Sequence, residues 1–287
     1  MGINIRTNIE SIRAQRDLSA TTDKLRQSYS RLSSGLRIVR AADDAAGLSI
    51  AEQLRADGRV AGAAIRNAND GISMIAISDG AMGEISNILV RMGELAEQSA
   101  NGVYSNAQRS ALQLEFAAIG SEVERIANTT EFNGMHLILS GFSTTFQVGL
   151  DGGLNSQVSY SGVGANLAAL NLATAGSSNL NFSIMAGTEA ESVISARSAL
   201  DAINVAIGSL SRNRGTLGAA ESRLNIAIEN LQVARENFAA AESRIRDVDV
   251  AEEAANLTQE NILQQAATAV LAQANQQPAL ALSLLKG

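Results

Sequence analysis

The chain has 287 residues, of which 46% are hydrophobic but only 3% aromatic, so Ala, Leu, Ile and Val must provide the burial, which suits closely packed helices. Cysteine is absent, which excludes disulfides and thiolate metal sites, and the net charge of −7 argues against a nucleic-acid partner. The only proline is Pro278, so long uninterrupted helices are permitted almost everywhere.

The first predicted helix covers residues 9–33. Its apolar residues recur at helical spacing on one side, namely Ile12, Leu18, Leu25, Tyr29 and Leu32. The three leucines are seven residues apart, as in a coiled coil. A lone helix of about 37 Å is marginal in water, so this one needs a partner. Ser33-Ser34-Gly35 then predicts a joint, because glycine takes the left-handed cap without steric cost.

A second helix is predicted from residue 44 to about residue 99. Asp43 or Asp44 can cap its N-terminus, where a carboxylate accepts free backbone N–H groups. Six glycines stand in its interior, each costing about 1 kcal/mol relative to Ala: Gly58, Gly62, Gly71, Gly80, Gly83 and Gly93. They indicate either close approach of another helix or a break, and we expect the break at 80–83. A turn at 100–106 then leads to a third helix at 107–128.

A small β region is predicted at about 135–186. Short runs at 135–139, 145–150 and 157–160 alternate with turns rich in Gly, Asn and Ser, and Asp151-Gly152 is a hairpin signal. The only histidine, His136, lies at the edge of a predicted strand. We expect it to be a structural or surface residue rather than a ligand.

Two more helices are predicted at 189–246 and at about 252–276. The first carries a coiled-coil stripe of Leu224, Ile228, Leu231, Phe238 and Ile245, which Arg235 and Glu242 interrupt. The last helix uses Leu257, Leu263, Ala267, Val270 and Leu271. Pro278 is expected to end it.

The two chain ends are predicted to lie side by side. Residues 1–40 hold eight basic and three acidic side chains, whereas residues 247–287 hold one basic and five acidic ones. The pattern predicts a mainly α fold: an elongated antiparallel helical bundle or coiled coil with a small β-hairpin region, its chain ends paired as a terminal helical coiled coil. The start MGINIRTN does not have the pattern of a cleavable signal peptide, so none is expected. We also expect no membrane insertion, because no apolar run reaches the length needed to span a bilayer.

The patterns of catalytic and cofactor sites are missing from the sequence. Phosphate-binding glycine motifs and nucleophile elbows do not occur. Asp43-Asp44 and Glu252-Glu253 could suggest paired carboxylates or a divalent metal, but adjacent residues at a helix start point apart. We expect them to be helix caps, and we expect no enzyme activity, cofactor or metal.

Four segments of the sequence resemble bacterial flagellin, the subunit of the flagellar filament. They are RLSSGLRIVRAADDAAGLSIA at 31–51, ELAEQSANG at 94–102, EFNG at 131–134 and AAESRIRDVDVAEEAANLTQENILQQAATAVLAQANQ from 240 onward. The resemblance extends over about 1–150 and 190–287. It implies a structural protein that polymerises into a helical tube, is exported without a cleaved signal peptide, and works outside the cell.

The resemblance also implies how the chain is divided. Residues 1–42 and 248–287 would form the two halves of an inner filament-core domain, and 43–247 a surrounding helical domain without large outer insertions. Apolar stripes that two helices alone cannot cover provide the candidate assembly residues Leu18, Leu25, Leu32, Leu257, Leu263, Val270 and Leu271. Expected partners are the chain itself, an export chaperone, the filament cap and hook-junction proteins.

A vertebrate Toll-like receptor is a further partner that the resemblance implies. The matching positions here are Arg91, Leu95 and Glu115, in a block that keeps Glu94 but has Val90 and Gly93 where the family often has Gln and Arg. Two other assignments stay open from the sequence: a hook–filament junction protein, which shares the terminal pattern, and a soluble chemosensory coiled coil, which would need a continuous hairpin with one tight apex.

Overall fold

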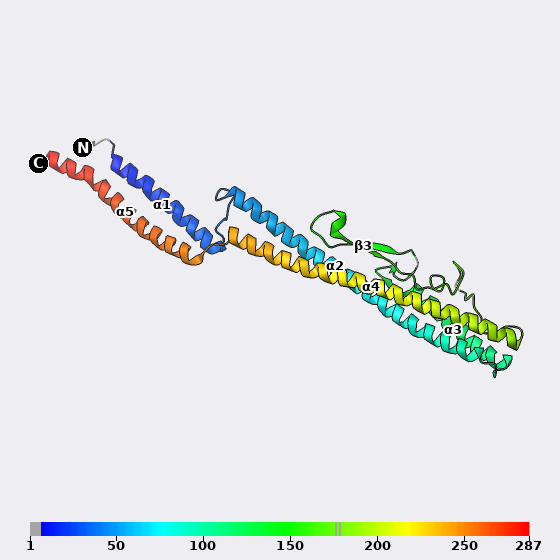
Figure 1. Cartoon of the computed structure of the whole chain (residues 1–287). Coiled ribbons are helices and arrows are strands. Elements are labelled where there is room, and N and C mark those ends of the chain that lie inside the picture. The colour runs from blue at the N-terminus through cyan, green and yellow to red at the C-terminus, as the bar shows by residue number, and fades with distance from the viewer. Residues whose placement is uncertain (1–6, 140, 176, 178, 287) are drawn as a thin grey trace. The chain divides into compact units, whose positions relative to one another are not determined.

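The computed structural model of the chain describes residues 7–139, 141–175, 177 and 179–286, with side chains up to residue 276. Figure 1 shows a mainly helical chain, as the sequence predicts. Its helices are α1 (Ile9–Ser34), α2 (Ala45–Ala100), α3 (Asn106–Thr129), α4 (Glu189–Arg246) and α5 (Val250–Lys286). Two compact units divide it: a terminal unit of Met1–Gly58 with Glu236–Gly287, and a central unit of Arg59–Arg235.

The strands form two small antiparallel pairs in the central unit. β1 (Glu131–Phe132) pairs with β2 (Met135–His136) across the Asn133-Gly134 turn, where both residues have positive φ. β3 (Ser143–Gln147) pairs with β4 (Gln157–Ser161), which confirms the predicted hairpin. The predicted strand at 135–139 is wrong beyond its first two residues, because Leu137 and Ile138 turn inward to the core instead of extending the ladder.

The core of the central unit lies among α2, α3 and α4. Leucines at seven-residue intervals on α4 are all buried, namely Leu210, Leu217, Leu224 and Leu231. From α2 and α3 the largest fully buried apolar residues are Met74, Ile75, Met82, Ile85, Leu89, Met92, Leu95 and Phe116. The apolar sides of α2, α3 and α4 therefore face this core.

The segment 162–188 completes the core, although its described residues (162–175, 177 and 179–188) form no helix or strand. Ala165, Leu167, Leu170, Leu172 and Ile184 are buried in the same cluster. Leu180 packs on α3 at Gly120, where an added Cβ would overlap its Cδ1. The lack of a side chain at Gly120 therefore lets Leu180 approach the helix closely.

Two predicted helix interruptions are wrong. α2 continues through Gly80 and Gly83, where no atom lies within 4 Å of an added Cβ, so these glycines mark neither a break nor a close approach. Packing of Ile75, Met82 and Ile85 in the core offsets their low helix propensity. α5 likewise continues past Pro278 to Lys286, and the alanines and leucines that follow the proline favour helix.

One helix of the described residues, α4, is long and apolar enough by length and composition to cross a membrane, contrary to the expectation from the sequence. A core helix of a protein without a membrane meets the same test. Ile203, Ala206 and Leu210 of α4 are buried in the core of the central unit, so we assign α4 as a core helix.

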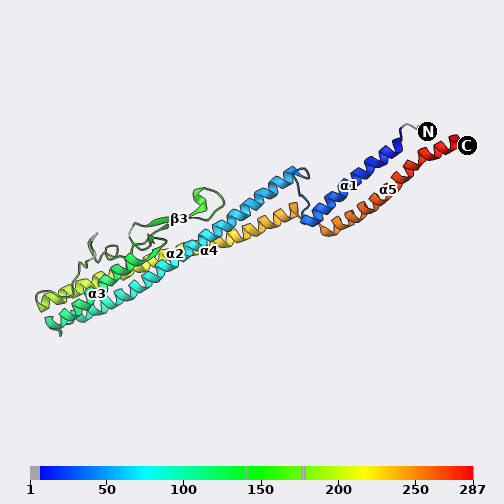
Figure 2. The same ribbon diagram turned by 180° about the vertical axis from the view of Figure 1, so that it is seen from behind.

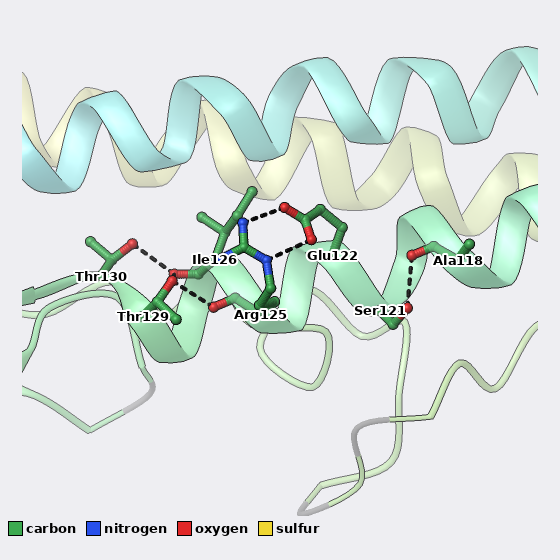
Figure 3. Close-up of polar contacts among 7 residues, drawn as sticks. All are labelled: Ala118, Ser121, Glu122, Arg125, Ile126, Thr129 and Thr130. Atoms are coloured by element: carbon green, nitrogen blue, oxygen red, sulfur yellow. Dashed lines mark hydrogen bonds and ion pairs between the residues drawn. The ribbon is translucent and has the colours of Figure 1, made fainter.

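Figure 3 shows how α3 ends, close to β1. The hydroxyl of Thr129 donates to the carbonyl of Arg125 at 2.8 Å, and the hydroxyl of Thr130 donates to that of Ile126 at 2.7 Å. On the solvent side Arg125 donates to both carboxylate oxygens of Glu122, and this guanidinium lowers the pKa of Glu122. The carbonyl of Ile126 also accepts the backbone N–H of Thr130 at 3.0 Å, so the threonine hydroxyls add to the backbone bonds of the last turn before the chain enters the hairpin.

Candidate assembly interface

Helices α1 and α5 of the terminal unit pack against each other as an antiparallel pair (Figures 1 and 2). Three side-chain contacts set their register. Asn8 donates to the carbonyl of Ala274 at 2.7 Å, Ser11 to Asn275 at 2.7 Å, and Gln264 to Thr22 at 3.3 Å. A residue of α1 and a residue of α5 whose numbers sum to about 286 therefore lie at the same level, meaning the same height along the axis of the pair.

The seam between the two helices repeats every seven residues. Its buried or half-buried positions on α1 are Ser11, Ala14, Leu18, Thr21, Leu25, Ser28 and Leu32, and on α5 they are Glu253, Leu257, Glu260, Gln264, Ala267, Leu271 and Ala274. Six of these fourteen side chains are polar. Among the seam leucines only Leu25, at 8% exposed, is buried, so the pair removes little apolar surface from water.

Charged groups lie inside this seam with few partners. Glu253 is only 6% exposed and lies 3.7 Å from the guanidinium of Arg31, a distance too long for a hydrogen bond. One buried carboxylate oxygen of Glu260, Oε2, has no hydrogen-bond partner, and the same holds for Nε of Arg31. Buried charges with incomplete partners weaken a two-helix pair.

The candidate assembly residues divide into two groups. Leu18, Leu25, Leu32, Leu257 and Leu271 are the seam positions described above. Leu263 and Val270 instead point outward and are 49% and 58% exposed. Ile9, Ile12, Tyr29 and Ile262 are outward as well, each more than half exposed. The sequence did not separate the two groups, because helical spacing shows which residues share a stripe but not which stripe the partner helix covers.

A shallow groove follows one side of the α1–α5 pair, and we call it the outer groove. Its apolar half, of about 280 Å³, is lined by Ala14, Asp17, Thr21, Leu263, Ala266, Ala267 and Val270. Its polar half, of about 210 Å³, is lined by Ala20, Thr21, Lys24, Asn256, Gln259, Glu260 and Leu263. Thr21 and Leu263 belong to both halves, so the groove is continuous.

Backbone hydrogen bonds hold the joint of the terminal unit. They connect the segment between α1 and α2 to the end of α4 and the segment that follows it. The N–H of Arg37 donates to the carbonyl of Arg246 at 2.6 Å, and the N–H of Val248 donates to that of Gly35 at 3.1 Å. Gly35 takes the predicted left-handed cap, with φ of 70°. The sequence did not indicate this pairing, because Leu36 and Asp247, which form the bridge, lie in no strand pattern.

Carboxylates cap the helices at this joint. Asp44 accepts the N–H of Gly47, as predicted. Asp43 instead closes the loop by accepting the N–H groups of Val39 and Arg40, and the latter bond is the main cause of its lowered pKa. For α5 the predicted cap at Glu252-Glu253 is wrong, since Asp249 accepts the N–H groups of Ala251 and Glu252.

The second candidate surface lies on the central unit, where Arg91 of α2 faces Glu115 of α3. The guanidinium donates to Glu115 at 2.8 and 3.0 Å and to Glu94 at 2.8 Å, and these two carboxylates raise the pKa of Arg91. All three side chains are about half exposed. Leu95, however, is 1% exposed in the core. A partner protein cannot contact it, which corrects its assignment as a surface residue.

A buried arginine that the sequence did not single out supports the end of α2. Arg109 is fully buried and donates to the carbonyls of Ser99 and Asn101, both at 2.9 Å. It thereby satisfies carbonyls that the helix end leaves free. Among the described residues no group of three or more His, Asp or Glu side chains could hold a metal ion.

Comparisons with known proteins agree with this architecture. The "Bacterial flagellin N-terminal helical region" matches residues 5–144, and the "Bacterial flagellin C-terminal helical region" matches residues 200–285. These matches together contain α1, α2, α3, most of α4 and nearly all of α5.

Relatives match over nearly their full length. A flagellin of Halalkalibacterium halodurans is 41% identical over 98% of this chain and 99% of the relative. The "Flagellar filament 33 kDa core protein" of Treponema phagedenis is 36% identical over 98% and 99%. Flagellin B of a Vibrio cholerae strain is 33% identical over 99% and 100%, in an alignment of 375 positions. The present chain is shorter than that alignment and carries no large outer domain. It belongs to the bacterial flagellin family.

Proposed function

We propose that this chain, as a member of a family of flagellar filament subunits, polymerises through the outward faces of α1 and α5. The observation that carries the proposal is the apolar surface left on that pair. Leu263 and Val270 line the outer groove, and Ile12 is 56% exposed on α1. A soluble pair of helices would expose charge at such positions, but residues 261–276 contain none. Further copies of the chain are the partners that would cover this surface.

The layers of the filament follow from this arrangement. Residues 1–42 and 248–287 would form the inner layer, where neighbouring copies cover the exposed stripes. Residues 43–247 would form the surrounding layer, which has its own core and needs no neighbour to bury it. The predicted layers differ in their bounds from the compact units, because the terminal unit also contains the first part of α2 and the last part of α4.

The protein would be located in the extracellular filament, and it would be exported without a cleaved signal peptide. An export chaperone, the filament cap and hook-junction proteins would be the partners on that route. No enzymatic activity is proposed, since the family is one of structural filament proteins. Mass spectrometry of exported protein tests the route, because a cleaved signal would remove residues from the segment that precedes α1.

A vertebrate Toll-like receptor would recognise the central unit at Arg91 and Glu115. Support comes from the exposure of both side chains and from their fixed geometry, in which one guanidinium joins α2 to α3. Leu95 has no place in this contact.

Polymerisation of the purified chain tests the main proposal. Seeded or salt-induced assembly, followed by sedimentation and electron microscopy, should give long tubes. Replacing Leu263 and Val270 together by Gln should prevent them, because the outer groove then loses its apolar wall. Gln265→Ala on the same helix is the matched control and should assemble as the parent does. A parent chain that stays monomeric under all these conditions would contradict the proposal.

A further inference from the structure

Given the proposed polymerisation, we infer that the outer groove receives the first two turns of α1 from a second copy of this chain. The inserting face would carry Ile9, Ile12, Arg13 and Arg16, which recur at i, i+3, i+4 and i+7 and are all exposed. Along α1, the inserting face has two apolar side chains followed by two cations. In the same direction the groove has its apolar half followed by its polar half, so apolar groups meet apolar groups and cations meet the polar end.

Charge complementarity fixes the polar end. The groove holds Asp17 and Glu260 against a single cation, Lys24. Glu260 is half-buried and lines the polar half of the groove. The cations on the inserting face are bound only to exposed neighbours, Arg13 to Glu10 and Arg16 to Asp17, both at 3.3 Å. Such pairs contribute little, so Arg16 is free to donate to Glu260 of another copy.

The direction of insertion follows from symmetry. Copies related by one screw axis keep the same direction along it, so the inserted α1 must run parallel to the α1 of the receiving subunit. If Ile12 of the inserted helix lies between Val270 and Ala266, the inserted α1 is displaced by about six residues, or roughly 9 Å, along the α1 of the receiving subunit. Arg16 then lies about four residues, or roughly 6 Å, from the level of Glu260, which a long arginine side chain spans.

The same contact cannot form within one chain. In its own subunit Glu260 is level with Arg26, about ten residues and roughly 15 Å from Arg16. Ile12 and Ala266 are also about eight residues apart in level, roughly 12 Å, beyond the roughly 7 Å between Cα atoms that a disulfide tolerates. A bond between these positions must therefore join two copies, and the contact is heterologous, as an open filament requires.

Disulfide cross-linking tests the inference, since the natural chain has no cysteine. A chain with Ile12→Cys and Ala266→Cys, polymerised and oxidised, should give a ladder of covalent oligomers, whereas its monomer should give none. The matched control combines Ile12→Cys with Gln265→Cys, because Gln265 is exposed but does not line the groove. Filaments that show no ladder for the first pair, or an equal ladder for both, would overturn the docking while leaving polymerisation intact.

If the cysteine variants do not assemble, exchanging the charges of Arg16 and Glu260 tests the same contact. Arg16→Glu and Glu260→Arg should each raise the critical concentration for assembly about tenfold, and the double variant should return to within about twofold of the parent. An additive double variant would overturn the contact between these residues. A parent chain that never polymerises would instead contradict the proposed function itself, so the two failures are distinguishable.

Discussion

The central and terminal units both use helices with apolar stripes but bury those stripes to very different degrees. In the central unit Met82, Leu89 and Phe116 are at most 1% exposed, and the segment 162–188 covers the remaining face. In the terminal unit six of the fourteen seam residues described above are polar, and Leu25 is the one buried leucine among them. A stripe of leucines therefore indicates a helix that needs a partner, but whether that partner lies in the same chain depends on how many other elements cover it.

The largest difference between the two units is expected when α5 is removed. Deletion of residues 248–287 should abolish filaments, because α1 loses the helix that pairs with it and the outer groove loses one wall. The rest should stay soluble and helical, since the described residues of the central core come from elements other than α5. Circular dichroism and electron microscopy check both halves. Filaments of normal diameter from the truncated chain would show that the terminal pair is dispensable.

Amide hydrogen exchange on the free monomer compares the two units directly. We expect α1 and α5 to exchange about a hundredfold faster or more than the buried turns of α2, because two helices with a polar seam do not offset the entropy of ordering them. In filaments the same amides should become protected. Equal protection of both units in the monomer would mean that the terminal pair folds alone.

Truncation of a large side chain should affect the two units differently. Phe116→Ala should lower the free energy of unfolding by about 3–5 kcal/mol, since it leaves a cavity in a closed core. Leu25→Ala should leave that main transition unchanged in the monomer. Denaturant titration of both variants gives the comparison, and a similar loss for the two would contradict it.

Replacing each of two glycines in the central unit by alanine should change the stability in opposite directions. Gly120→Ala should destabilise it by about 1–3 kcal/mol, because the new Cβ would overlap Leu180. Gly80→Ala meets no neighbouring atom and should stabilise α2 by up to about 1 kcal/mol. Thermal unfolding measures both. A neutral Gly120→Ala would show that the segment 162–188 moves aside at little cost.

The smallest effect on folding is expected at the Arg91 surface. Arg91→Ala should weaken the response of cells that report on the flagellin-recognising Toll-like receptor, while helicity and the thermal midpoint stay as in the parent, because the ion pair is exposed. Leu114→Ala, an exposed neighbour of Glu115 on α3, serves as a control for general surface change. An unchanged response for Arg91→Ala would refute the assignment.

Most of the fold could be predicted because heptad leucines and caps are local signals. The helix starts at Asp44 and Glu189 and the end at Gly35 follow from them. What the sequence could not show depends on tertiary contacts. Whether Gly80 breaks a helix is decided by the core beneath it, and whether Leu95 is exposed is decided by which side α4 covers. The same holds for Arg109, whose carbonyl partners come together only when α3 folds back on α2.

The bridge between Leu36 and Asp247 has a consequence for the order in which the chain folds. It joins residue 36 to residue 247, and α5, the helix that pairs with α1 among the described residues, begins after it. The core of the central unit draws on α2, α3 and α4, so it can close before α5 has been made. Helix α1 gains its partner helix only after that, so the terminal pair is the last part of the subunit to form.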